Sequence, residues 1–159
     1  MQKITPFLWY ASEAEEAARL YTSIFPDSRI TGITTLPTDS PSGPAGSVKV
    51  VAFQLFGQDF TAMTAGGNEP FNHAVSFMVD CADQAEVDRY WDALLQDGGR
   101  PEACGWLRDR FGVAWQIVPR VLLEMIGAPD RAAAKRAADA MMGMVKLDVA
   151  GLRAAFERG

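Results

Sequence analysis

An internal repeat limits the possible folds of this chain more than any single motif does. Each half of the sequence predicts a strand, a capped helix and then three further strands. Ser12 with Glu15, and Asp83 with Glu86, have the spacing of a helix-capping box at the start of the two predicted helices. The repeat therefore predicts an α+β fold built from two βαβββ modules.

The last hairpin of each half gives the alignment between the modules. The segment GQDFTAMT, residues 57–64, matches GVAWQIVP, residues 112–119. Both segments read as the turn and returning strand of a hairpin. This alignment places Thr61 opposite Gln116.

The repeat also sets the expected domain boundaries. The first module should span residues 1–66 and the second residues 67–120. The remaining segment, 121–159, is predicted to be helical, with its last helix beginning at Asp148. A length of 159 residues is normal for one domain, so we expect the three parts to form one compact unit.

Composition narrows the classes of partner. The net charge of −5 disfavours binding to the phosphate backbone of a nucleic acid. No apolar run is long enough to cross a bilayer, and the N-terminus lacks the apolar core of a signal peptide, so we expect a cytoplasmic protein with no membrane partner. The two cysteines, Cys81 and Cys104, are expected to be free thiols in a reducing compartment.

Three stretches resemble the PhnB-like branch of the vicinal oxygen chelate superfamily, which includes glyoxalase I, extradiol dioxygenases and antibiotic-resistance proteins. They are residues 4–30, residues 71–99 and the segment CGWLRDRFGVAWQIVP, residues 104–119. Members of this branch often carry the label 3-demethylubiquinone-9 3-methyltransferase. The resemblance implies that each module curls its sheet into a half-barrel around a cavity, and that the protein is a homodimer, often with modules exchanged between chains.

The resemblance also implies where a divalent metal would be held, on the first and last strands of the modules. His73 and Gln116 occupy such positions in the second module and are the candidate ligands, whereas the first module offers Thr61. A catalytic site usually has three protein ligands, so we expect no firm metal site. A divalent metal stays open because the carboxylates of Glu69 and Asp59 could complete the set. The other readings of His73 are a surface imidazole with one hydrogen bond, and an acid or base.

Gln116 is the polar residue of an otherwise apolar strand. Strand alternation places it on the same face as Ala114 and Val118. A buried amide needs hydrogen-bond partners. We rank a substrate contact in the cavity first, a satisfied core amide second and a metal ligand third.

Other side chains are candidates for the cavity wall. We expect Cys104 and Trp106 to share one strand face with Arg108 next along it, and we read Asp109 as part of a turn with Gly112. Core packing is the alternative for every aromatic residue and for the cysteine. The full set of predicted cavity-lining residues is Trp9, Phe53, Thr61, His73, Phe77, Cys104, Trp106 and Gln116.

Three functions fit these features. The first is a metal-free protein that binds a small apolar or aromatic molecule. The second is a metal-dependent lyase, isomerase or dioxygenase with an unusual site around His73, and the third is an interaction scaffold with a filled cavity. A methyltransferase is disfavoured, because neither AGG at 65–67 nor DGG at 97–99 forms the glycine-rich strand-to-helix turn of the usual donor site.

Overall fold

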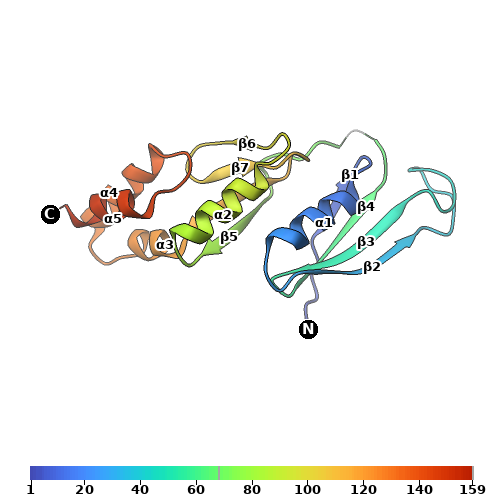
Figure 1. Ribbon diagram of the computed structural model, residues 1–159, viewed down its shortest axis with the longest axis horizontal. Coiled ribbons are helices and arrows are strands. Elements are labelled where there is room, and N and C mark those ends of the chain that lie inside the picture. The colour runs from blue at the N-terminus through green and yellow to red at the C-terminus, as the bar shows by residue number, and fades with distance from the viewer. Residues whose placement is uncertain (68, 159) are drawn as a thin grey trace. The chain divides into compact units, whose positions relative to one another are not determined.

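The computed structural model describes residues 1–67 and 69–158 and divides into two compact units, Met1–Pro70 and Phe71–Gly159. The helices after residue 120 belong to the second unit, whereas the predicted module boundaries at 66 and 120 stay predictions. The elements of the first unit are β1 (Phe7–Tyr10), α1 (Ala14–Ile24), β2 (Arg29–Thr35), β3 (Lys49–Leu55) and β4 (Gln58–Thr64) (Figure 1). Those of the second are β5 (Ser76–Cys81), α2 (Gln84–Leu94), β6 (Arg100–Pro101), β7 (Trp106–Arg108), β8 (Ala114–Pro119), α3 (Arg120–Ile126), α4 (Arg131–Met142) and α5 (Val149–Glu157).

The predicted repeat is confirmed by the sheet topology. The strand order is β1-β4-β3-β2 in the first unit and β5-β8-β7-β6 in the second. In each sheet the first strand pairs in parallel with the last strand of its module, and the other pairs are antiparallel. The fold is therefore α+β with two βαβββ modules, as expected.

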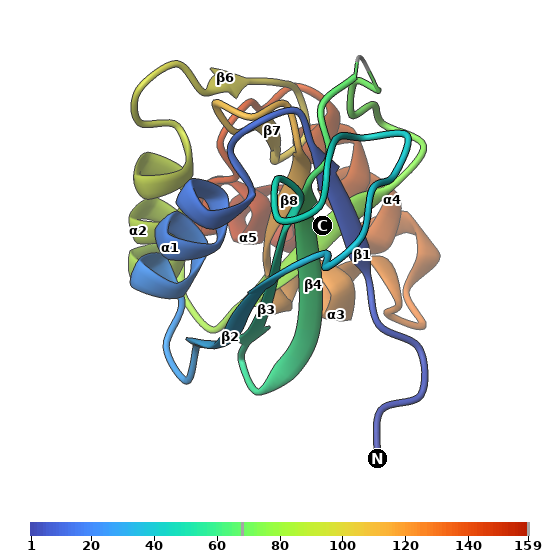
Figure 2. The same cartoon turned by 90° about the vertical axis from the view of Figure 1, so that its right-hand side faces the viewer.

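In the first unit, α1 packs on one face of its sheet (Figure 2). The side chains that alternate toward α1 are buried, and among them Phe53 is 1% exposed and stacks on Phe60 with ring centroids 5.5 Å apart. Burying a phenylalanine of this kind stabilises the fold by about 2–3 kcal/mol. The opposite face of the sheet, which we call the open face of the first unit, carries Phe7 and Trp9, which are 57% and 38% exposed.

The second unit repeats this arrangement. Val79 and Ile117 lie side by side on β5 and β8, are buried, and face α2 together with Leu107 of β7. The open face of the second unit is again the side without that helix. Its far end is covered, because Val118 packs into an apolar cluster with Leu152 and other residues of α3, α4 and α5.

The two hairpins close in different ways. Between β3 and β4 the turn residues Phe56 and Gly57 both have positive φ, 50° and 75°, as a two-residue type I′ turn requires. Between β7 and β8 the turn is longer and is built on Asp109, which is 3% exposed. Its carboxylate accepts hydrogen bonds from the backbone N–H groups of Phe111 and Val113 and, at 2.9 Å, from Trp115 Nε1. The predicted turn is confirmed, with Gly112 at φ 91°.

Two of the three predicted helix starts are confirmed. The Asp83 side chain accepts from the N–H of Glu86, and the Asp148 side chain accepts from the N–H of Gly151. The prediction for Ser12 is wrong, because α1 starts one residue later, with Glu13 at the cap position and no side-chain cap.

The segment before β7 differs from the prediction. Cys104 is not in a strand: its φ is +62°, so it does not share a strand face with Trp106. The N–H groups of Cys104 and Gly105 instead donate to the carbonyls of Met144 and Val145, both at 2.8 Å. This turn thus ties the helical extension to the sheet of the second unit. Among the described residues, no helix is long and apolar enough to cross a bilayer.

Candidate functional site

The open face of the second unit carries a row of three side chains across neighbouring strands. Met78 pairs in register with Gln116, and Gln116 pairs with Trp106. We call these three residues the Gln116 row. Met78 is 53% exposed and the other two are half-buried, so the row presents an aromatic ring, a thioether and an amide to its surroundings. In the next row Arg108 stands on β7 beside Ala114 of β8.

A charged cluster borders the Gln116 row. His73 Nε2 lies 2.5 Å from Glu102 Oε2, and Arg108 Nε donates to Glu102 Oε1 at 3.2 Å. Arg108 Nη2 lies 2.7 Å from His73 Nδ1. The His73 ring also meets the Trp106 ring edge-on, with centroids 5.8 Å apart. The cluster and the aromatic wall are therefore one continuous surface.

The hydrogen bonds of the cluster define the tautomer of His73. Arg108 can only donate, so Nδ1 must accept, and Nε2 then carries the proton that is donated to Glu102. Both ring nitrogens are engaged inside the cluster. In this arrangement His73 contacts both Arg108 and Glu102, and a metal or a substrate would have to displace one of them to reach a ring nitrogen.

Gln116 is half-buried, and one hydrogen bond holds its side-chain amide. Its Nε2 donates to Ser76 Oγ at 2.9 Å, so the amide is fixed by its neighbour on β5. Among the residues that the structure describes, none donates to Gln116 Oε1. That oxygen is an acceptor available on the open face.

The residues around His73 do not fit a divalent metal. A site of this kind usually has three protein ligands, and no group of three or more His, Cys, Asp or Glu side chains occurs in the described parts of the chain. The Arg108 guanidinium also donates to both His73 and Glu102, so a cation already faces the two best donors. Asp59 is exposed and accepts from Gln54, so it does not reach inward.

The predicted cavity residues divide by face. Trp9 and Thr61 lie on the open face of the first unit, where Trp9 Nε1 donates to the carbonyl of Gly66 at 2.8 Å. Phe53 and Phe77 lie on the helix-covered faces instead. Phe53 belongs to the core of the first unit, and Phe77 packs on Trp115 with ring centroids 5.5 Å apart. For these two phenylalanines the alternative prediction, core packing, is correct. Their strands carry apolar residues on both faces, so alternation alone does not show which face is buried.

The structure adds residues that the sequence analysis did not select. Glu102 lies between β6 and β7 and is brought to His73 by the backbone hydrogen bond from its N–H to the Trp106 carbonyl, at 2.9 Å. Met78 and Ser76 follow from the alternation of β5 once its buried face is known. Alternation could have identified the latter pair, whereas no spacing rule links Glu102 to His73.

The sequence also matches a known protein family. Residues 2–118 match the model of the 3-demethylubiquinone-9 3-methyltransferase family. The chain belongs to this family. The match ends at β8, so the helical extension lies outside it. No curated protein is detectably similar to this chain.

Solved structures support the same assignment. A putative 3-demethylubiquinone-9 3-methyltransferase, PhnB protein, from Bacillus cereus is 33% identical over 74% of this chain and 99% of its own, with a TM-score of 0.63. The fosfomycin resistance protein FosX from Mesorhizobium loti is 15% identical over 73% of this chain and 89% of its own, with a TM-score of 0.52. FosX from Listeria monocytogenes, solved with Mn(II) and 1S,2S-dihydroxypropylphosphonic acid, is 14% identical over 74% of this chain and 91% of its own, with a TM-score of 0.51. At these identities the FosX structures share the fold alone.

Proposed function

We propose that this protein binds a small apolar or aromatic molecule, without a metal, on the open face of the second unit. The observation that carries the proposal is the Gln116 row beside the charged cluster. Trp106 and Met78 offer an apolar surface, and Gln116 Oε1 and the Arg108 guanidinium offer one acceptor and one donor next to it. Ligand sites have this composition, mostly apolar with a few fixed polar groups.

The catalytic alternative has less support from the cluster. A general base needs a nitrogen or oxygen that faces the substrate, and both nitrogens of His73 are engaged by Arg108 and Glu102. Arg108 neutralises Glu102 at 3.2 Å. These residues are better suited to fixing the orientation of a ligand than to transferring its protons.

The methyltransferase activity in the family's name is not part of the proposal. A methyl-donor site of the usual type begins with a glycine-rich turn between a strand and a helix. In the described chain, residues 11–13 connect β1 to α1 and residues 82–83 connect β5 to α2, and neither connection contains glycine; α3 follows β8 with no residue between them.

One observation favours a second candidate, a metal-dependent lyase, isomerase or dioxygenase. His73 Nε2 and Glu102 Oε2 are 2.5 Å apart, and imidazole and carboxylate are the ligand types that Mn²⁺ and Zn²⁺ accept. Mn(II) accompanies the Listeria FosX structure. To bind a metal here, His73 and Glu102 would have to lose their contacts with Arg108, and a third ligand would have to be added.

We also propose that the protein is a cytoplasmic homodimer. The resemblance described above implies that the two chains can exchange modules. The exposed Phe7 and Trp9 on the open face of the first unit support an association that covers them.

The test is a fragment screen by ligand-observed NMR on wild-type protein, followed by Kd measurements with Trp106→Ala and Gln116→Ala. We expect aromatic fragments to bind and each variant to weaken binding about tenfold. Asp139→Ala, an exposed substitution on α4 outside the Gln116 row and the charged cluster, is the control and should leave Kd unchanged. Fragments that bind all three variants as well as wild type would place the site elsewhere.

A titration with Mn²⁺, Zn²⁺, Ni²⁺ and Fe²⁺ separates the two candidates. The metal-free proposal predicts no stoichiometric binding to wild type or to His73→Ala. Binding at micromolar concentration that is lost in both His73→Ala and Glu102→Gln would replace it with the metalloenzyme.

A further inference from the structure

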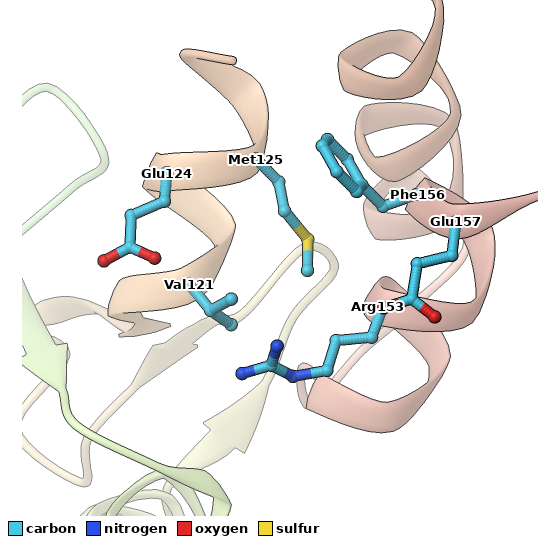
Figure 3. Close-up of a pocket in the computed structure, with 6 residues that line it drawn as sticks. All are labelled: Val121, Glu124, Met125, Arg153, Phe156 and Glu157. Carbon is cyan, nitrogen blue, oxygen red and sulfur yellow. The ribbon is translucent and has the colours of Figure 1, made fainter. Parts of the chain in front are cut away.

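The helical extension contains a pocket of about 260 Å³ between α3 and α5 (Figure 3). It lies beyond residue 118, where the family match ends, so the proposed function does not involve it. Six residues line it: Val121, Glu124, Met125, Arg153, Phe156 and Glu157.

One part of the pocket is apolar. Met125 is 6% exposed and belongs to the core of the extension, and Val121 and Phe156 pack against the same core. In Figure 3 these three side chains face the gap between the two helices. They form the apolar wall of the pocket.

The rim of the pocket carries charges of both signs. Arg153 extends from α5 toward α3 in Figure 3, with Glu157 one turn further along α5 and Glu124 on α3. Within residues 1–67 and 69–158, none of these three side chains forms a hydrogen bond or an ion pair. Arg153 and Glu157 have the i, i+4 spacing at which helix residues commonly pair. They do not pair here, so the Arg153 guanidinium and the Glu157 carboxylate stand separately on the rim of one apolar pocket, while Glu124 lies within electrostatic reach of Arg120.

We propose that this pocket binds a small zwitterion with an apolar side chain, of the chemical class of a free aliphatic α-amino acid. The Arg153 guanidinium would donate two hydrogen bonds to the carboxylate, and the Glu157 carboxylate would bind the ammonium group. Val121, Met125 and Phe156 would contact the side chain. The volume is below the usual range for drug-sized ligands and suits a single amino acid.

The charge pattern selects the zwitterion over simpler ligands. A monoanion would pair with Arg153 but would be repelled by the carboxylates on the rim. A monocation would be repelled by Arg153. The three charged residues are exposed, so each ion pair contributes little, and the affinity is weak, about millimolar.

The experiment is a titration of ¹⁵N-labelled full chain with L-leucine, with 4-methylpentanoate, which lacks the amine, and with isopentylamine, which lacks the carboxylate. We expect saturable shifts in α3 and α5 with leucine, and affinities about fivefold or more lower for the other two. Arg153→Gln and Glu157→Gln should each lower the leucine affinity by a similar factor. Arg158→Gln removes a cation from the same helix end outside the pocket and is the matched control.

Three results would overturn the proposal. They are the absence of saturable shifts in α3 and α5, equal affinity for leucine and its two truncated analogues, and binding that survives Arg153→Gln. Thermal unfolding of each variant checks the fold, which these exposed substitutions should leave intact.

Discussion

The two βαβββ units share a strand order but carry different chemistry on their open faces. In the second unit the Gln116 row presents an aromatic ring and an amide, and Arg108 stands beside it. The hairpin alignment places Thr61, Ala52 and Gln54 of the first unit at the positions of Gln116, Trp106 and Arg108. The topology thus fixes where a site can form, and a few outward-facing side chains decide whether one does.

The comparison extends to the hairpins. The first unit closes β3 and β4 with two residues at positive φ, Phe56 and Gly57, whose N–H groups donate to Ser28 Oγ and to the Asp27 carbonyl. The second relies on the buried Asp109 carboxylate and on Gly105, whose position against the extension has no counterpart in the first unit. The second unit is therefore expected to be more sensitive to single substitutions at its turns.

The largest expected effect is that of Gly105→Ala. A Cβ at Gly105 would lie 2.8 Å from Leu147 Cδ1 and 3.0 Å from the Ile117 carbonyl oxygen, and φ is +81°. Left-handed strain and overpacking together should lower the free energy of unfolding by about 3 kcal/mol. Gly112→Ala is the control: φ is +91° but no atom lies within 4 Å of its Cβ, so the loss should be about 1 kcal/mol. Urea denaturation measures both, and equal losses would contradict the role of Leu147.

Asp109→Ala should have the next largest effect. It removes the acceptor of three hydrogen bonds, those donated by the part-buried N–H of Phe111, the buried N–H of Val113 and the buried indole of Trp115. We expect a loss of about 2–3 kcal/mol in the free energy of unfolding. Asp139→Ala, which removes an exposed carboxylate paired with Lys135 in the same unit, should cost about 0.5 kcal/mol or less. Comparable midpoints in urea for the two variants would refute the proposed function of Asp109 in the turn.

The proposed site can be tested directly by replacing two of its residues in the second unit with their counterparts from the first. Trp106→Ala with Arg108→Gln should weaken fragment binding by about tenfold or more while the fold is retained. The reverse change in the first unit, Gln54→Arg, should leave the Kd unchanged, because no counterpart of the His73–Glu102 pair faces it among the described residues. Kd values by NMR titration decide the outcome, and unchanged binding in the double variant would show that the open faces do not differ in function.

The smallest expected effect concerns Cys81, which occupies the position of Tyr10 in the first unit. Burial, followed by the charges of Glu86 and Asp80, raises the pKa of the Cys81 thiol from 9.0 to about 12. Iodoacetamide at pH 8 should therefore modify Cys104 and spare Cys81 in the folded protein.

The same pKa shift makes the stability of the folded protein depend on pH. The folded state holds the Cys81 proton in the interval from pH 9.0 to about 12 while the unfolded state releases it, so stability is full below pH 9.0 and falls as the pH rises through this interval. Cys81→Ala should flatten that fall in urea denaturation at alkaline pH. An unchanged slope would mean that the thiol is not the group that titrates.

The sequence was sufficient for the fold because its signals are local. Alternation, the Asp83 and Asp148 caps and the repeated hairpin all lie within short segments, and the structure confirms them. The site was only partly predictable. Trp106 and Gln116 were predicted from their strands, and His73 from a strand that in the structure begins only at Ser76. Glu102 and His73 both lie in segments outside the strands, so no periodicity predicts that they meet. The positive φ of Cys104 is likewise not indicated by its residue type.

The contacts between Gly105 and the helical extension also order events during synthesis. The first unit can complete its sheet as soon as β4 has left the ribosome, since all its pairs lie within the first 70 residues. The N–H groups of Cys104 and Gly105 lack their native carbonyl partners, and Val118 stays uncovered, until Met144, Val145 and Leu152 emerge. On the nascent chain the second unit therefore waits as an incomplete sheet, and this interval is when chaperone binding or mispairing of its strands would compete with folding.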